Sequence, residues 1–389
     1  MKPISVENPG NTVEERAQGA LWGLAWGDAL GCPVETWRAS FIREVFGAYV
    51  DLPSEQPLQG LAGDSKRLSR LRPLGLHSDD TQQGLALAAC ALEPGGWTRA
   101  SWARWLIEGM HRKAWRGYGR NFKTAVQQLA RGGAPEHSGS ASAGMGAAMR
   151  VAPVGALLRD SPGELARVVM ESSMMTHADL RASALAYAVA WSVAALVRGE
   201  AVDSVRAGVA PAVREEESRW LQLAEAWTFD RTGEHLVSDT LAALLEGPLL
   251  APEALRERIS ELARPHLAEG FTVAHPNQGF ALLGGGHGLV RALTATEPPG
   301  AVLADIVQQG YDTDTVAAIA GGVLGARFGS GWVPRGRLLD AERLELYARA
   351  LVTRSGPPEA LDVFVRKEAA WTAEEQRFQA GLVGGHGVH

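Results

Sequence analysis

Apolar residues recur in this 389-residue chain at the three- and four-residue spacing of an α-helix, in one segment after another. After Ser78, for example, the apolar side chains of Leu85, Ala88, Ala89 and Leu92 fall on one helical face. Runs that alternate between apolar and polar residues, as half-buried strands do, are scarce, and none repeats at the spacing of βαβ units. The pattern therefore predicts an all-α protein.

Helical spacing covers much of the chain, and small residues are frequent within it. Besides the segments that follow Ser78 and Asp314, we expect helices at 15–30, 98–110, 163–174, 179–197, 216–228, 237–247, 252–267, 299–309 and 340–352. The segment after Asp314 contains residues small enough to let a neighbouring helix approach closely, namely Ala317, Ala318, Gly321, Gly322 and Gly325. Loops are expected at 52–76, 131–146 and 265–288.

The length suits one large domain or two ordinary ones, and neither an internal repeat nor a low-complexity linker divides the chain. We predict a single compact multi-helix domain over residues 10–355. A C-terminal helical extension and tail would follow over residues 356–389, with Gly381–His389 expected to fray.

Charge and cysteine content narrow the class of protein. The formal net charge is -6 without long runs of one sign, which argues against binding to nucleic acid or an anionic membrane through charge alone. The weakly polar run Ala182–Val197 is too short to span a bilayer and is typical of a buried helix. Met1–Glu7 lacks the apolar core of a signal peptide, and Cys32 and Cys90 cannot form a disulfide framework, so we expect a cytoplasmic protein.

Two short acidic segments, far apart in the sequence, each precede an apolar helix. The first acidic segment is Ser78–Thr81 (SDDT) and the second is Asp312–Thr315 (DTDT). Ser, Asp and Thr are preferred helix N-caps, and Asp79 with Gln82 fits a capping box. Capping explains one acid per helix, but it does not explain two.

Clustered buried carboxylates are costly unless positive charge neutralises them. Oxygen donors without a nearby Cys or His favour Mg²⁺ or Mn²⁺ over Zn²⁺. If the two acidic segments meet in space, they therefore predict a site for one or two divalent cations. Its oxygen ligands would be Ser78, Asp79, Asp80, Asp312, Asp314 and Thr315.

Two glycine-containing segments add candidates for binding and catalysis. The segment Gly19–Glu35 (GALWGLAWGDALGCPVE) predicts a small-residue helix broken at Gly31 and Pro33, which delivers Glu35 on a loop. The segment Ser142–Pro153 (SAGMGAAMRVAP) would expose backbone N–H groups ahead of a helix, as phosphate-binding loops do. Taken alone, a G-x-G motif is more often a turn.

Together with the acidic segments, these motifs resemble, in order, those of the ADP-ribosylglycohydrolase family, which includes dinitrogenase-reductase-activating glycohydrolases and animal ADP-ribosylhydrolases. The family pattern is G-a-l-l-G-l-a-x-G-D-A-l-G-x-p-v-E, T/S-D-D-T, G-N-G-a-x-M-R-x-x-P, T-H and G-G-D-T-D-T-x-a-a-i-a-G. Its counterparts here cover roughly residues 17–330. The resemblance implies an all-α domain with a two-metal centre at the floor of an ADP-ribose cleft.

The resemblance also implies a role for individual residues. The six oxygen ligands named above would hold two Mg²⁺ or Mn²⁺ ions. Glu35 matches the glutamate proposed for acid–base catalysis, and a metal-bridging Asp such as Asp79 is the other candidate. ADP-ribose would contact Gly117, Tyr118, Gly119, Ser142, Gly144, Gly146 and His177.

Plainer interpretations of several residues stay open. Glu35 could be a solvated loop acid, His177 a structural helix cap, and Tyr118 ordinary surface packing instead of a stacking partner for adenine. Asp28 is expected to stabilise a local turn, and Cys32 to be a small buried residue.

The chain departs from the family pattern at four positions. Met145 stands where Asn is usual, which removes a polar contact to the ligand. Tyr311 replaces the second Gly of G-G-D-T-D-T and would reshape the rim beside the metals. Ser78 replaces a common Thr and keeps its hydroxyl. Gly117 stands where arginine-type members often carry an Asp, which weakens a carry-over of arginine specificity.

The function implied is that of a metal-dependent hydrolase that cleaves the glycosidic bond between ADP-ribose and a modified acceptor and releases ADP-ribose. The acceptor is expected to be a protein side chain, arginine-type slightly favoured, with a small molecule or nucleic acid as further options. A cognate ADP-ribosyltransferase is an expected partner, and a membrane is not. Two alternatives stay open: a catalytically weak ADP-ribose-binding protein, and an immunity protein against an ADP-ribosylating toxin.

Overall fold

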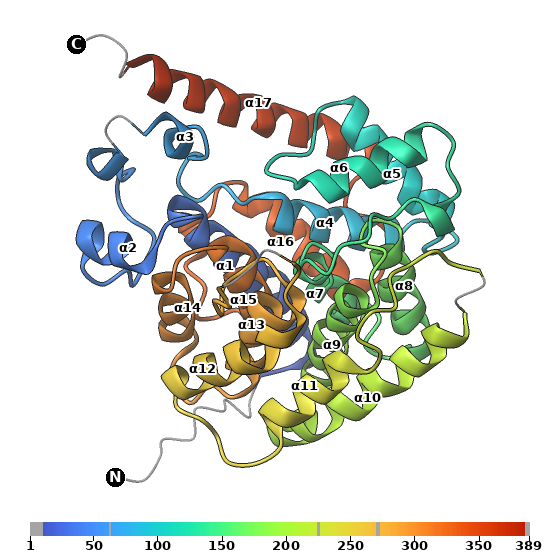
Figure 1. Ribbon diagram of the computed structural model, residues 1–389. Helices are drawn as coiled ribbons and strands as arrows, with labels where there is room; N and C mark the ends of the chain where they lie inside the picture. The colour runs from blue at the N-terminus through green and yellow to red at the C-terminus, as the bar shows by residue number, and fades with distance from the viewer. Residues whose placement is uncertain (1–10, 62–63, 224–225, 270–272, 386–389) are drawn as a thin grey trace.

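The computed structural model describes residues 11–61, 64–223, 226–269 and 273–385. The N-terminal segment 1–10 and the last four residues of the expected tail lie outside these ranges. Within the described residues, helices form the whole regular secondary structure, and β-type pairing is limited to three isolated bridges. The prediction of an all-α fold is confirmed (Figure 1).

The helices are joined by connections of very different lengths, and the longest ones precede α3, α7 and α13. In chain order they are α1 (Val13–Gly31), α2 (Ala39–Phe46), α3 (Ser65–Leu68), α4 (Asp79–Ala91), α5 (Arg99–His111), α6 (Arg120–Ala130), α7 (Ala152–Leu157), α8 (Pro162–Met174), α9 (Leu180–Val197), α10 (Val202–Gln222), α11 (Leu236–Leu245), α12 (Pro252–Ala263), α13 (Gly286–Leu293), α14 (Pro299–Gln308), α15 (Thr313–Phe328), α16 (Ala341–Thr353) and α17 (Leu361–Gly385).

Four of the sequence predictions were wrong in their boundaries. The tail expected to fray from Gly381 is helical as far as Gly385, and the loop expected at 52–76 contains α3. The helix expected at 216–228 is the end of α10, which begins at Val202 and stops at Gln222. The loop expected at 265–288 contains a buried π-helical turn, Ala281–Gly285, that leads into α13. Its glycines signal close packing instead of a turn, because a Cβ on Gly285 would lie 2.0 Å from the side chain of Leu185.

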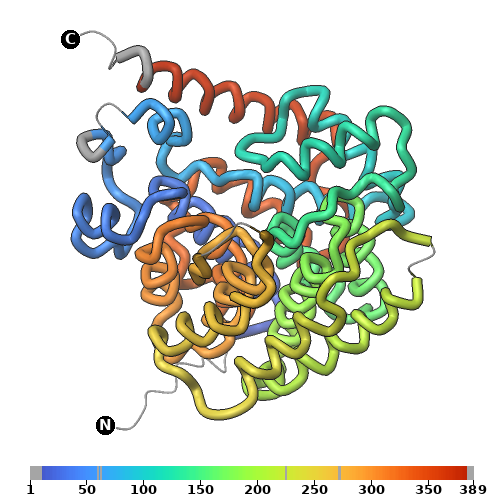
Figure 2. The backbone as a smooth tube through the Cα atoms, in the orientation of Figure 1, coloured from blue at the N-terminus to red at the C-terminus, as the bar shows by residue number. Residues whose placement is uncertain are grey.

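Helices α1 and α15 lie at the centre of the molecule (Figures 1 and 2) and run side by side in antiparallel directions, with their backbones in contact. The prediction that the small residues of α15 allow close packing is confirmed. A Cβ added to Gly23 of α1 would lie 2.0 Å from the carbonyl oxygen of Gly321, and one on Gly27 would lie 2.0 Å from that of Ala317. No other residue type leaves room for this approach.

Helix α9 is the most apolar long helix of the described chain. Leu180–Val197 has the length and mean hydropathy of a membrane span, yet 89% of it is buried inside the protein. Its neighbours are α7, α8, α10 and α15, which surround it on all sides. The prediction of a buried helix over this run is confirmed, and its apolar composition is explained by its place in the core.

Helix α17 runs along one edge of the molecule, at the top of Figure 1, and a buried ionic network joins it to the rest. Glu368 accepts hydrogen bonds from Arg116 (2.6 Å) and from Arg343, and all three side chains are buried. The two guanidinium groups hold the pKa of Glu368 well below its usual range, although burial opposes them. Removing one partner from such a network leaves an uncompensated buried charge. The domain boundary at residue 355 stays a prediction.

The contact between α1 and α15 predicts a large effect of a single methyl group. We expect Gly23→Ala to lower the free energy of unfolding by about 3 kcal/mol, the upper end for overpacking, because the nearest atom is backbone and cannot move aside. Denaturant unfolding measures the change. Gly163→Ala is the control, since Gly163 lies exposed in the first turn of α8 with open space around it. An equal effect of the two substitutions would contradict the packing argument.

Candidate functional site

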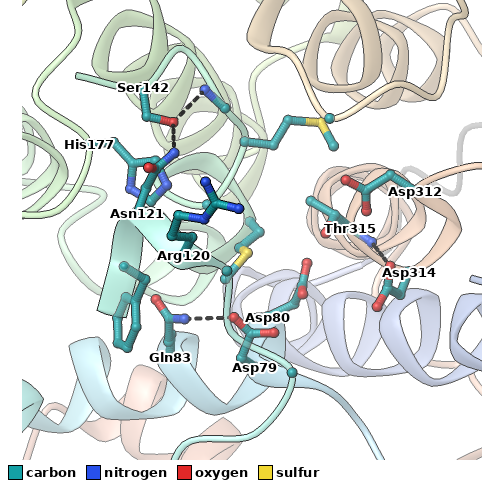
Figure 3. A pocket seen from close by; sticks show the side chains of 18 of the residues that line it. Asp79, Asp80, Gln83, Arg120, Asn121, Ser142, His177, Asp312, Asp314 and Thr315 are labelled. Atoms are coloured by element: carbon teal, nitrogen blue, oxygen red, sulfur yellow. Dashed lines mark hydrogen bonds between the residues drawn. The ribbon is translucent and has the colours of Figure 1, made fainter. Parts of the chain in front are cut away.

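A pocket of about 280 Å³ lies between the N-termini of α4 and α15 (Figure 3). We call it the central pocket. It brings together most of the residues that the sequence singled out: Glu35, Asp79, Asp80, Gly117, Gly119, Ser142, Gly144, Gly146, His177, Asp312, Asp314 and Thr315. Ser78 and Tyr118 do not line it. The two acidic segments therefore face one pocket from opposite sides.

Asp28 ties the first acidic segment to α1. Its carboxylate accepts hydrogen bonds from the backbone N–H of Ser78 (2.8 Å), the backbone N–H of Thr81 (3.0 Å) and the hydroxyl of Thr81 (2.6 Å). Asp28 thus caps α4 across the fold, where the sequence suggested a local turn. A buried carboxylate that accepts three hydrogen bonds at a helix N-terminus is well satisfied.

Ser78 is the N-cap residue of α4. Its hydroxyl accepts the backbone N–H of Asp80 at 3.2 Å and donates to Asp80 Oδ2 at 2.8 Å. The capping box suggested for Asp79 and Gln82 is wrong, because Asp79 is the first residue of the helix. Gln82 instead donates to the carbonyl oxygen of Ala114 and to Glu368.

The second acidic segment contacts the C-terminal end of α1, the end that also carries Asp28. The hydroxyl of Thr313 donates to the carbonyl oxygen of Gly31 at 2.8 Å. A Cβ on Gly31 would lie 2.4 Å from the backbone nitrogen of Asp314, so only glycine permits this contact. Asp28 and Gly31 stand one turn apart on α1, and through them this helix holds both acidic segments in place.

The pocket carboxylates are buried with little compensating charge. Burial, the largest cause, raises the pKa of Asp79 to about 7 and of Asp312 to about 6, and it raises the pKa of Asp80 and Asp314 well above the usual range. The neighbouring carboxylates act in the same direction. Asp80 Oδ1 is buried without a hydrogen-bond partner among the described residues. Such a group is costly unless a proton or a cation neutralises it.

Another set of possible ligand atoms lies beside the pocket but is already engaged. Atoms of Asp28, Cys32 and Asp314 lie within 4.8 Å of one another. However, the thiol of Cys32 donates to Asp28 at 3.3 Å and accepts from Arg72 at 3.1 Å. Cys32 is buried, as predicted, and burial raises the pKa of its thiol well above the usual range. A protonated thiol is a poor ligand, which leaves the aspartates of the pocket as the better set.

A buried hydrogen-bond chain connects Asp79 to the far side of the pocket. Gln83 donates to Asp79 Oδ2 at 2.9 Å and accepts from Arg150 at 2.8 Å, and Arg150 donates in turn to the hydroxyl of Thr176 at 2.8 Å. That hydroxyl lies 3.0 Å from Nδ1 of His177. Gln83 was not predicted from the sequence, although its position one helical turn after Asp79 was a usable signal.

His177 fixes the shape of the glycine loop. A Cβ on Gly146 would lie 2.6 Å from the His177 ring, so the ring and this glycine pack directly together. Burial lowers the pKa of His177 to about 3, which keeps the ring neutral. His177 is not a helix cap, because the cap of α9 is Asp179.

Glu35 lies on the rim of the pocket, on a loop that is pinned to the second acidic segment. The N–H of Thr36 donates to the carbonyl of Tyr311 at 2.6 Å, and the N–H of Tyr311 donates to the carbonyl of Trp37 at 2.7 Å. Glu35 itself pairs with Arg70 at 2.9 Å and is partly exposed.

Tyr311 adopts the left-handed backbone conformation, with φ of 65°, at the position where the family pattern has glycine. A non-glycine residue there costs about 1–2 kcal/mol. The phenol ring stacks on His275 with ring centroids 3.9 Å apart, and the paired backbone holds the conformation. The substitution therefore changes the surface of the rim and keeps the path of the chain.

Besides Gln83, three polar residues of the pocket were not predicted from the sequence. Asn121 donates to the hydroxyl of Ser142 at 2.8 Å, and Arg120 points into the pocket beside it (Figure 3). Arg72 is buried, pairs with Glu375 of α17 at 3.0 Å and lines the pocket near Gly117. Asn121 and Arg120 follow Gly117–Gly119 directly, whereas nothing local marks Arg72.

Comparison with known proteins places the chain in a family. Residues 9–360 match the model of the ADP-ribosylglycohydrolase family, and the chain belongs to this family. A solved structure described as an ADP-ribosylglycohydrolase-related protein complex shares the fold, with a TM-score of 0.60, 24% sequence identity and coverage of 88% of this chain and 99% of that one.

Three relatives are similar in sequence. An uncharacterized protein from Archaeoglobus fulgidus is 34% identical over 187 residues, which is 47% of this chain and only 56% of that protein. The uncharacterized protein YegU from Escherichia coli is 28% identical over 81% of this chain and 88% of its own length. The ADP-ribosyl-[dinitrogen reductase] glycohydrolase from Rhodospirillum rubrum is 24% identical over 85% of this chain and 91% of its own.

The raised pKa values predict how stability depends on pH without divalent cations. Between about pH 4 and pH 7 the folded state keeps protons on Asp79 and Asp312 that the unfolded state releases, so these groups make the free energy of unfolding fall as pH rises. Buried histidines such as His177 act in the opposite sense. We therefore compare variants, and we expect the Asp79→Asn substitution to stabilise the protein more at about pH 8 than at about pH 5.

Urea unfolding in chelator at several pH values measures this difference. Asp362→Asn is the control, since the side chain of Asp362 on α17 is 73% exposed. If Asp79→Asn and Asp362→Asn shift the stability curve equally, the carboxyl of Asp79 does not titrate as the burial of the site implies.

Proposed function

We propose that this protein is a divalent-metal-dependent hydrolase that cleaves the glycosidic bond between ADP-ribose and a modified acceptor and releases ADP-ribose. Membership in the ADP-ribosylglycohydrolase family supports the reaction class. The observation that carries the proposal is the meeting of two acidic segments and a glycine loop at one pocket.

The residues of the pocket fit two Mg²⁺ or Mn²⁺ ions. Asp79, Asp80, Asp312 and Asp314 supply oxygen ligands, with hydroxyls of Thr315 and Ser78 as further donors. These carboxylates are buried and have raised pKa values, and Asp80 Oδ1 has no hydrogen-bond partner among the residues that the structure describes. These features are expected of carboxylates that bind a cation. Ser78 is the weaker candidate, since its hydroxyl already bonds to Asp80. Divalent cations bound there would stabilise negative charge and lower the pKa of water.

The other residues would bind ADP-ribose and move the proton. The loop at Ser142, Gly144 and Gly146 would hold the diphosphate, with the ring of His177 packed behind it. Glu35 lies at the rim, where it can take a proton from water or give one to the leaving group. The bond that breaks is the glycosidic bond at C1″, the anomeric carbon of the ribose that is linked to the acceptor. Asp79, held by Gln83, is the other candidate for this proton transfer.

The acceptor is proposed to be a protein side chain. An arginine-linked acceptor remains the first to test, and the chemistry at C1″ is the same for a small molecule. A cognate ADP-ribosyltransferase would supply the substrate. Tyr118 lies outside the central pocket and packs against Phe122, with ring centroids 5.7 Å apart, so we do not assign it a stacking role on adenine.

Removal of one aspartate tests the metal proposal. We expect Asp314→Asn to lower kcat/KM at least about a hundredfold, because cation binding contributes several kcal/mol and about 1.4 kcal/mol corresponds to a factor of ten. Release of free ADP-ribose from arginine-linked substrate is the assay. Chelation should abolish release by the wild type, and Mg²⁺ or Mn²⁺ should restore it. Full activity in chelator would overturn the metal dependence.

Glu35→Gln separates catalysis from binding. General acid–base catalysis contributes about a hundredfold or more, so kcat should fall by that factor while the Kd of ADP-ribose stays within about twofold. Calorimetry gives the Kd and the release assay gives kcat. The matched control is Glu164→Gln, whose side chain on α8 is 43% exposed and lines neither the central pocket nor the cavities beside it. Loss of affinity without loss of kcat would make Glu35 a binding residue.

A wild type that binds ADP-ribose but does not hydrolyse the arginine-linked substrate would favour the alternative of a catalytically weak ADP-ribose-binding protein.

A further inference from the structure

The central pocket opens into a second cavity that no assigned role explains. This cavity, of about 510 Å³, lies between α6, the segments before α4 and α6, and helix α17. We call it the α17 cavity. It shares Glu35, Arg72 and Gly117 with the central pocket. Its wall on α17 is formed by Thr372, Glu375, Gln376 and Gln379.

A third cavity extends from the opposite side of the central pocket. It has a volume of about 680 Å³ and shares Asn121, Ser142, Gly144 and Gly279 with the central pocket. The carboxylates thus stand between two arms of one cleft. If the loop at Ser142 holds the diphosphate, as proposed above, the nucleotide lies toward this third cavity, and the acceptor leaves past Glu35 into the α17 cavity.

Basic side chains dominate the α17 cavity. Arg70, Arg72, Arg116 and Lys123 line it, against Glu35 and Glu375. Two of these arginines are paired inside the cavity, Arg70 with Glu35 and Arg72 with Glu375. Glu368 balances Arg116 from behind the wall.

The unpaired charge that remains in the α17 cavity, once these ion pairs are formed, is positive. The ammonium of Lys123 is exposed and forms no ion pair with any described residue. Arg116 adds no free charge, because its side chain is fully buried and paired with Glu368. Arg120, one turn before Lys123 on α6, lacks an ion pair among the described residues, as Lys123 does, and faces the central pocket.

We propose that the α17 cavity receives the acceptor and selects a peptide segment with acidic side chains next to the ADP-ribosylated residue. The inference rests on the proposed function and specifies its substrate. Carboxylates of the peptide would meet the exposed ammonium of Lys123, the lining cation that forms no ion pair among the described residues. A peptide fits better than nucleic acid, because the chain carries a net charge of -6 and this basic group is small.

Helix α17 has a specific part in this proposal. The family match ends at residue 360, just before α17 begins at Leu361. Glu375 holds Arg72 at the junction of the two cavities, and Glu368 holds Arg116 in the wall. The helix therefore supplies one side of the acceptor cavity and positions two of its arginines.

Two peptides test the proposal. Both carry ADP-ribose on the same central arginine, and they differ only in flanking Asp or flanking Lys. With Mg²⁺ we expect the wild type to show a kcat/KM at least about tenfold higher on the peptide with flanking Asp. Lys123→Glu on α6 and Gln376→Glu on α17 should each reduce this ratio at least about fivefold and leave the Kd of free ADP-ribose unchanged. Lys113→Glu and Gln222→Glu, outside the cavity, are the matched controls and should leave the ratio as it is.

The outcomes separate this inference from the proposed function. If neither peptide is cleaved, their Kd values replace kcat/KM in the same comparison. Equal values for the two peptides overturn the acceptor proposal while ADP-ribose binding stands. If Lys123→Glu weakens the binding of free ADP-ribose, the cavity binds the nucleotide and the acceptor proposal is overturned. A preference for an ADP-ribosylated oligonucleotide over the peptide with flanking Asp also overturns the acceptor proposal. If the wild type binds neither peptide nor free ADP-ribose, both the proposed function and this inference fail.

Discussion

The backbone contact between α1 and α15 is the constraint on which the site depends. Gly19, Gly23, Gly27 and Gly31 recur at every fourth residue of α1 and meet α15 along its length. Because carbonyl oxygens lie where side chains would be, the two helices cannot slide past each other without collision. The contact ends at Gly31 and Asp314, so the same packing that builds the core also sets the position of the second acidic segment.

The first acidic segment reaches the same place through a different interaction. Asp28, on the last turns of α1, satisfies the N-terminus of α4 with three hydrogen bonds. A stable network formed by Gln83, Arg150 and Thr176 then holds Asp79 from below. The buried hydrogen bonds fix the position of the Asp79 carboxyl, while burial raises its pKa to about 7.

The cleft has two arms whose chemistry differs. The arm beyond Ser142 is lined by a mixture of apolar, polar and charged side chains of both signs and belongs to the part of the chain that matches the family. The arm beyond Glu35 is basic and takes one wall from α17, which follows the matched region. Under the proposed function, one reaction centre with a separately built acceptor side would let this fold serve different modified targets.

Some features of this protein were determined by the sequence alone. The helical spacing predicted the all-α fold, the small residues of α15 predicted close packing, and the run at Ala182–Val197 predicted a buried helix. These features depend on neighbours within a few turns, which is why a pattern reveals them. The ordered motifs also indicated the family. The same motifs predicted most of the residues that line the central pocket, without information on their contacts.

The tertiary structure decided the rest. No local pattern shows that Asp28 caps α4, that Gln82 turns toward Glu368, or that Arg72 enters the pocket from a segment held by α17. Glycines at 284–286 suggested a loop because their packing partners lie elsewhere in the chain. Whether the two acidic segments meet depends on the register of α1 against α15, and register is a property of two packed surfaces that neither segment carries by itself.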